Sequence, residues 1–160
     1  MAPTGQVHMR ASPVGGLGGM YATGLSVDDV VRLSALVPSV AHNQVWHFKA
    51  ATEDPDTEVF IILTDREHRD WRWSSIGEKP VPDAPVVLST DPKRQIAWKV
   101  KRLDIGVKDA IAFIYTDPHL LGVKWYAGTE NNQVIFKPFP IDAPEDVVPY
   151  WVLSDVELTE

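Results

Sequence analysis

Cysteine is absent from this chain of 160 residues. The protein therefore has no disulfide, no thiolate nucleophile and no cysteine-ligated zinc or iron–sulfur cluster. Any redox chemistry would need a bound cofactor.

The chain also lacks a surplus of basic residues and a long apolar run. Lys and Arg number 15 against 22 Asp and Glu, which gives a net charge of -7 and argues against double-stranded nucleic acid as a partner. Residues 1–24 show neither the basic start of a signal peptide nor an apolar stretch of about 18 residues that could span a membrane. We expect a cytoplasmic protein with no membrane association.

The hydrophobic content of 44% is enough for one domain with a real core. Gly and small residues dominate the first part of the chain, so we predict a flexible Gly-rich arm over residues 1–24 and a single domain over 25–160. No internal repeat is evident in the sequence.

Two helices are predicted. Ser26 and Asp29 form a capping box before apolar residues at helical spacing, and Pro38 ends that run. A second apolar stripe at helical spacing extends from Arg94 to Tyr115.

Five β-like runs are predicted: residues 44–48, 59–63, 85–89, 123–127 and 149–153, the first two joined as a hairpin. The charged segment 65–83 is predicted to be a short helix or a loop. Its Trp71 and Trp73 are candidates for a substrate pocket, whereas Trp46, Trp98 and Trp151 lie in apolar patterns typical of a core. Helices and strands together predict an α+β fold.

No metal site is predicted, because His42 and His47 stand five residues apart, on opposite faces of a strand, with no H-E-x-x-H pattern. The glycines between Gly15 and Gly19 follow no predicted strand, which favours a flexible loop over a phosphate cradle. A serine hydrolase is not indicated either, since no G-x-S-x-G motif is present.

The order of short motifs resembles the FMN-dependent nitroreductase family over Arg10 to Val156. The resemblance implies a mixed sheet flanked by helices, a dimer, and one FMN in each of two interface sites. It also implies hydride transfer through the flavin, from NAD(P)H to a small organic substrate, with the chemistry supplied by the flavin. The motifs are Pro38-Ser39 with Gln44, Trp46 and Phe48, then Asp83 to Leu88, Asp104-Ile105-Gly106, Leu121-Gly122, and Pro144 to Pro149.

The resemblance also implies which residues bind the flavin. Arg10 and Ser12 fall near the family's phosphate clamp, and Leu121-Gly122 would approach the ring with backbone. The full set of implied cofactor-binding residues is Arg10, Ser12, Pro38, Ser39, His42, Asn43, Gln44, Leu121 and Gly122.

Two alternatives stay open at this point. Ala11 stands where the family has a second clamp arginine, and His42 stands where it has an asparagine. These departures favour a flavin-poor structural or regulatory subunit that pairs with an active flavoprotein. The other alternative is a small-molecule binding module on an unrelated fold.

Overall fold

The computed structural model describes residues 6–12, 20–35, 43–51, 59–64, 71–77, 81–104, 109–116 and 122–155. These residues form twelve strands and no α-helix. The strands are β1 (Gln6–Ala11), β2 (Tyr21–Thr23), β3 (Arg32–Ser34), β4 (Trp46–Ala50), β5 (Val59–Thr64), β6 (Arg72–Ser74), β7 (Val87–Ser89), β8 (Trp98–Asp104), β9 (Asp109–Thr116), β10 (Val123–Glu130), β11 (Gln133–Pro140) and β12 (Trp151–Asp155).

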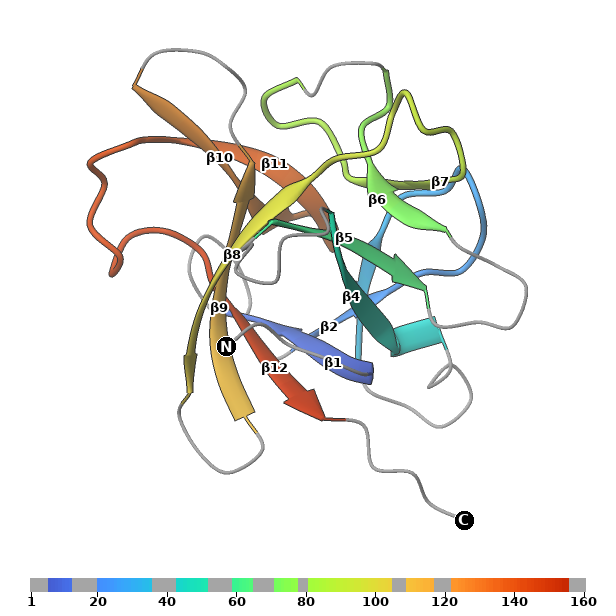
Figure 1. The fold of residues 1–160 in the computed structure, drawn as a ribbon, viewed down its shortest axis with the longest axis horizontal. Helices are drawn as coiled ribbons and strands as arrows, with labels where there is room; N and C mark the ends of the chain where they lie inside the picture. The colour runs from blue at the N-terminus through green and yellow to red at the C-terminus, as the bar shows by residue number, and fades with distance from the viewer. Residues whose placement is uncertain are drawn as a thin grey trace.

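Six of the strands close into an antiparallel barrel. Going round the ring, β1 pairs with β4, β4 with β5, β5 with β8, β8 with β9, β9 with β12, and β12 with β1. The remaining strands form the pairs β2–β3, β6–β7 and β10–β11. In Figure 1 the barrel strands β1 and β12 lie in the lower half, and the pairs β6–β7 and β10–β11 lie in the upper half. Closure leaves the barrel strands without a free edge.

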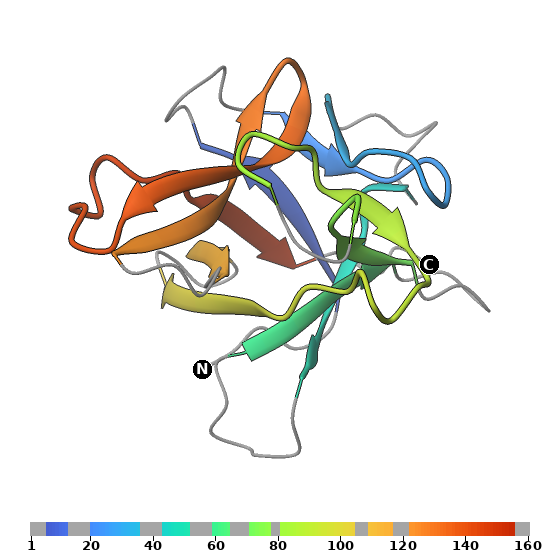
Figure 2. The same cartoon turned by 90° about the horizontal axis from the view of Figure 1, so that it is seen from above.

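The chain passes through this architecture in three similar units: β1–β4, β5–β8 and β9–β12. In each unit the first and fourth strands pair with each other in the barrel, and the second and third form the extra pair. Figure 2 shows the same strands from above. This threefold arrangement is a β-trefoil. The internal repetition is therefore present in the fold, although the sequence did not reveal it.

The three extra strand pairs are joined at the threefold axis by a ring of backbone hydrogen bonds. Val31 N–H donates to Val86 O (2.8 Å), Val86 N–H to Val134 O (2.7 Å), and Val134 N–H to Val31 O (2.9 Å). All three valines are buried. Because each unit supplies one donor and one acceptor, the ring ties the three units into one body.

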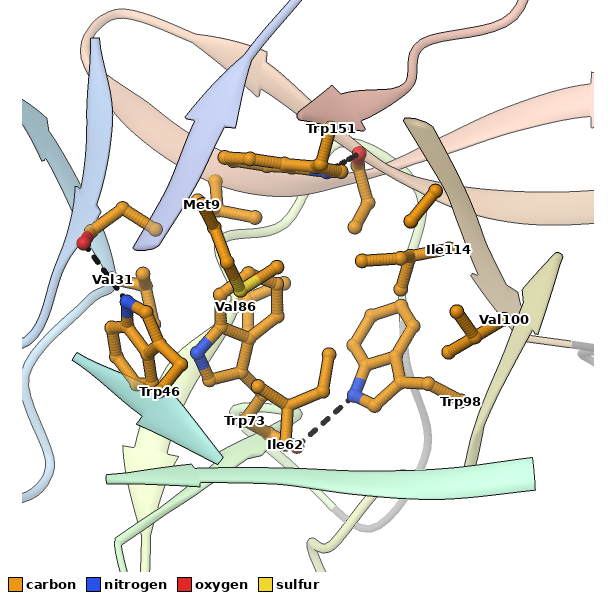
Figure 3. Close-up of a cluster of buried hydrophobic side chains, with 14 of the residues drawn as sticks. Met9, Val31, Trp46, Ile62, Trp73, Val86, Trp98, Val100, Ile114 and Trp151 are labelled. Carbon is orange, nitrogen blue, oxygen red and sulfur yellow. Dashed lines mark hydrogen bonds between the residues drawn. The ribbon is translucent and has the colours of Figure 1, made fainter. Parts of the chain in front are cut away.

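Three tryptophans repeat with the same symmetry inside the barrel. Trp46, Trp98 and Trp151 are the first residues of β4, β8 and β12, and all are fully buried. Each indole N–H donates to a backbone carbonyl of the second strand of its own unit, as the dashed lines in Figure 3 show. The acceptors are Ala22 (2.9 Å), Trp73 (3.4 Å) and Ala127 (2.9 Å). These bonds satisfy the polar end of each large ring inside an apolar core.

The predicted helix after Ser26 is wrong. Residues 26–35 instead form a turn and then β3, with Asp28 in a left-handed conformation (φ 65°) that no α-helix contains. The capping-box pattern was misleading, because Asp29 bonds the next backbone N–H and the Arg32 side chain. The β-branched valines of this segment bond across the molecule, as Val31 does to Val86.

The predicted helix from Arg94 to Tyr115 is also wrong, since this segment holds β8 and β9. In β8 the residues Trp98 and Val100 point inward and alternate with exposed Lys99 and Lys101, which is a period of two. In β9 most residues are buried on both faces, so apolar residues occur at helical spacing by coincidence.

The predicted α+β fold is therefore replaced by an all-β fold, because both helices are strands and turns. The five predicted β-like runs overlap β4, β5, β7, β10 and β12, and the predicted hairpin is the antiparallel pair β4–β5. Within the arm expected over residues 1–24, residues 6–11 form β1, and β1 pairs with three strands. No helix in the described ranges is long and apolar enough to cross a membrane.

Candidate functional site

The ends of β1, β2 and β3 lie together at one edge of the first unit. Arg10 pairs with Tyr21, and Tyr21 pairs with Ser34, so the end of β1, the first residue of β2 and the last of β3 are neighbours. The connections 12–20 and 35–45 both leave from this edge, which we call the first-unit edge. Binding residues are often found on such connections above a rigid scaffold.

A buried glutamine cross-links the elements behind this edge. Gln44 is fully buried, and its amide Nε2 donates to Ala35 O (2.9 Å) and to Thr23 Oγ1 (3.1 Å). Its backbone O accepts a hydrogen bond from His8 Nδ1 at 2.9 Å. Because a carbonyl can only accept, the proton of the His8 ring lies on Nδ1 in this contact.

The preceding residue adds a further link. Asn43 O accepts the backbone N–H of Gly24 at 2.8 Å, so the chain after β2 and the end of the 35–45 connection are held side by side. Two acceptor atoms of this pair, Asn43 Oδ1 and Gln44 Oε1, are buried and have no hydrogen-bond partner among the described residues. A buried acceptor without a partner costs about 1–3 kcal/mol.

The other two units have no polar residue at the position of Gln44. Gln44 lies two residues before Trp46, and the residues two before Trp98 and Trp151 are Ile96 and Pro149. The barrel is thus built twice with an apolar residue in this place. A local departure that lowers stability is typical of a functional position.

The third unit carries a second hydrophobic cluster on the outside of the barrel. Phe113, Tyr126 and Val148 are buried there, and Tyr150 packs against Phe113 with ring centroids 6.1 Å apart. Burial raises the pKa of Tyr126 above its usual value of 10.0, and the nearby Tyr115 and Glu145 raise it further. The cluster holds the described connection 141–150 against the barrel.

The structure describes five of the nine residues that the nitroreductase resemblance had implied around a flavin. Arg10 is exposed on β1, and the buried Ser12 accepts the Tyr150 backbone N–H with its Oγ (3.2 Å). Asn43 and Gln44 lie behind the first-unit edge.

Gly122 lies before β10 with φ 80°, in the third unit, and its carbonyl accepts the Ile141 N–H (2.8 Å). Of the two pocket candidates, Trp71 is partly buried and Trp73 is fully buried in the core. Outside the described residues lie Pro38, Ser39, His42 and Leu121.

Sequence reasoning missed His8, Thr23 and Ala35, which make the contacts around Gln44. A signal was available: Trp46, Trp98 and Trp151 recur at intervals of 52 and 53 residues. Aligning the chain on these tryptophans places Gln44 opposite Ile96 and Pro149, so the spacing of the tryptophans is enough to mark this glutamine as exceptional.

Comparison with known proteins gives two consistent matches. The model of the family described as peptidase inhibitor clitocypin matches residues 5–153. Clitocypin-2 of Clitocybe nebularis is 26% identical over 141 residues, which cover 88% of this chain and 86% of that protein.

These matches correct the sequence-based assignment. The short motifs shared with nitroreductases were coincidental. The resemblance depended on two predicted helices between these motifs, and the structure has strands and turns in their place. The predicted FMN, NAD(P)H and oxidoreductase activity are withdrawn, as are the small-molecule substrate, the homodimer and the flavoprotein partner. Both alternatives, a flavin-poor subunit and a small-molecule binding module, are also overturned. Since the match covers nearly the whole chain, the protein belongs to the family of the peptidase inhibitor clitocypin.

Proposed function

We propose that this protein inhibits peptidases and that its first-unit edge contacts the peptidase. The observation that carries the proposal is the family match over residues 5–153. The alignment with the relative in Clitocybe nebularis covers most of both chains, so the two proteins share nearly the whole domain.

The fold supports this proposal because it supplies a rigid scaffold without disulfides. Many small inhibitors hold their binding loops with disulfide bridges, which this chain cannot form. Here the closed barrel and the four fully buried tryptophans provide the rigidity instead. A pre-organised surface binds with a smaller loss of conformational entropy.

The first-unit edge is favoured because the ends of β1, β2 and β3 meet there and because a buried polar residue cross-links the elements behind it. The sequence of the first connection adds support. It contains Gly15, Gly16, Gly18 and Gly19, and glycine allows a backbone to approach a partner closely.

The size of the protein is adequate for this task. A protease–inhibitor interface takes about 800 Å² from each partner. The protein has an accessible surface of 8882 Å², so such an interface would use about a tenth of it.

The test is inhibition of purified peptidases of the cysteine, serine, aspartic and metallo classes, measured with fluorogenic peptide substrates. We expect reversible, competitive inhibition of at least one class at submicromolar concentration. Absence of inhibition in all four classes at tens of micromolar would overturn the proposal.

A peptidase substrate can imitate a competitive inhibitor. The reaction mixtures should therefore be followed by mass spectrometry for several hours. An intact chain with undiminished inhibition supports the proposal, whereas inhibition that fades as the chain is cut contradicts it.

The cytoplasmic location expected from the sequence stays a prediction.

A further inference from the structure

We propose that the outer face of strands β8 to β11 binds an acidic, extended peptide segment of a partner protein. The binding groups are four lysines, and we call their surface the lysine face: Lys99 and Lys101 of β8, Lys124 of β10 and Lys137 of β11. This interaction goes beyond peptidase inhibition. It does not depend on the first-unit edge, because that edge is built from β1, β2 and β3.

The strand register places the lysines on one face of the sheet. Residues directly opposite each other in an antiparallel pair point to the same face. Lys99 pairs with Tyr115 of β9, and Tyr115 pairs with Tyr126 of β10. Tyr126 pairs in turn with Lys137 of β11. Lys99 is exposed, so this row of four residues lies on the outside of the protein.

The lysines occur in two pairs with similar spacing. Lys101 follows Lys99 by two residues along β8, which separates their backbone positions by about 7 Å. Lys124 lies two residues before Tyr126, the residue opposite Lys137, so the two lysines are diagonal neighbours about 7–8 Å apart. Alternate residues of an extended peptide are also about 7 Å apart. The spacing therefore matches carboxylates at alternate positions of an extended acidic segment.

Two of the lysines are held by contacts within the sheet. Lys124 Nζ lies 4.6 Å from the centroid of the Tyr115 ring, which is a cation–π contact. The stem of Lys137 lies over the buried Gly128 of β10, where an added Cβ would come within 2.9 Å of Lys137 Cγ and Cδ. Side chains held in this way lose less freedom when they bind a ligand.

The lysine face already binds one carboxylate of this chain. Lys101 Nζ lies 2.6 Å from Glu145 Oε1, on the connection that precedes β12, and both side chains are about half exposed. Among the residues that the structure describes, Lys99, Lys124 and Lys137 form no ion pair. Three ammonium groups are thus available to carboxylates of a partner, beside one that shows how such a carboxylate binds.

The charge of this face is opposite to that of the whole chain. The protein has a net charge of -7, yet four of its eight lysines are on the lysine face. An acidic segment is repelled by most of such a surface and attracted to this part of it, which orients binding. Four lysines are few for a nucleic acid, whose binding depends on neutralising many phosphates. Charge and spacing together favour an acidic peptide.

The test measures binding of a fluorescein-labelled peptide of about ten residues, with glutamate and threonine in alternation, to the full chain. Fluorescence anisotropy at neutral pH and low salt gives the dissociation constant. We expect a value of about 10–100 μM, and no binding of the matched peptide with glutamine in place of glutamate. Raising the salt concentration from about 0.05 to about 0.5 M should weaken binding at least about threefold, because exposed charges are screened.

A pair of double variants assigns the binding to the lysine face. Lys99→Gln with Lys124→Gln should weaken binding by about threefold to thirtyfold, since two exposed ion pairs are lost. Arg10→Gln with Lys93→Gln is the matched control. It changes the net charge equally at exposed residues outside the lysine face, so its affinity should stay within about twofold of the wild type. Circular dichroism checks that all variants are folded.

Four results would overturn the proposal. They are no binding of the glutamate peptide at about 1 mM, equal weakening in both double variants, binding of RNA or heparin to the same lysines more than about tenfold more tightly than the peptide, and self-association that the peptide disrupts. The last two would assign the face to another polyanion or to a second copy of this chain. Inhibition of peptidases is measured on the same preparations. Since the lysine face and the first-unit edge are on different strands, either proposal can fail while the other stands.

Discussion

The interior of the protein and its first-unit edge follow different rules. In the interior, each unit places a tryptophan at the start of its fourth strand and bonds it to the second strand of that unit. Behind the edge, the units differ, since the buried Gln44 occupies a position that Ile96 and Pro149 occupy elsewhere. The shared part explains how the chain folds. The part that differs lies behind the edge where we propose that a peptidase binds.

The interior contains one departure of its own, and it gives the largest expected effect. Trp73 lies where the other units have Ala22 and Ala127, as the acceptors of the indole hydrogen bonds show. Its ring contacts Trp46, Trp98 and Trp151 in T-shaped arrangements, with centroids 5.4, 6.1 and 5.9 Å apart (Figure 3).

Trp73→Ala should lower the free energy of unfolding by about 3–5 kcal/mol, because it opens a cavity where three large rings meet. Urea unfolding followed by far-UV circular dichroism measures this loss. Trp71→Ala is the control, since Trp71 is only partly buried and should cost less. A loss below about 1 kcal/mol for Trp73→Ala would contradict this prediction, since it would show that the core is nearly as stable with an alanine at this position in all three units.

A smaller effect is expected at Gly24, which directly follows β2 of the first unit. A Cβ added to Gly24 would lie 2.7 Å from Leu88 Cδ1 and 2.9 Å from Trp46 Cη2, both on buried side chains. Gly24→Ala should therefore cost about 1–3 kcal/mol through overpacking.

Gly77→Ala in the second unit is the matched control. A Cβ at Gly77 meets nothing within 4 Å, so the change in stability should stay within about 0.5 kcal/mol. Thermal unfolding of both variants tests the difference. Equal losses would mean that backbone freedom, and not the tight contact of Gly24 with the core, governs both positions.

The sequence predicted individual strands better than it predicted the overall fold. The run from Val59 to Leu63 is a strand because β-branched and aromatic residues follow one another there, and that pattern is local. Closure of the barrel depends on β1 pairing with β12, at opposite ends of the chain, which no local pattern reports. The helix predicted between Arg94 and Tyr115 was wrong because the apolar residues of a strand buried on both faces can also occur at helical spacing.

The candidate site was predictable only in part. Gln44 was selected from the sequence, but as a flavin contact implied by a resemblance. Its hydrogen bonds to Thr23 and Ala35 arise from tertiary structure, so its cross-linking role could not be predicted from neighbouring residues. The spacing of the tryptophans was the one sequence signal that could have exposed the repeat.

The smallest expected effect concerns the outer face of the third unit and depends on pH. In the third unit, burial raises the pKa of Tyr126 above 10.0 in the folded protein. Between pH 10 and the folded pKa, the unfolded chain releases a proton that the folded chain keeps. Unfolding is then favoured as pH rises, so this contribution to stability is complete below pH 10 and is lost above it.

Tyr126→Phe removes the titrating group and should flatten the fall in stability above pH 10, while leaving the profile between pH 6 and 9 parallel to that of the wild type. Urea unfolding midpoints at half-unit steps of pH measure both profiles. Identical slopes for wild type and Tyr126→Phe would contradict the role of this tyrosine. A flattened slope in Tyr126→Phe would place part of the alkaline sensitivity in the outer cluster of the third unit, away from the first-unit edge.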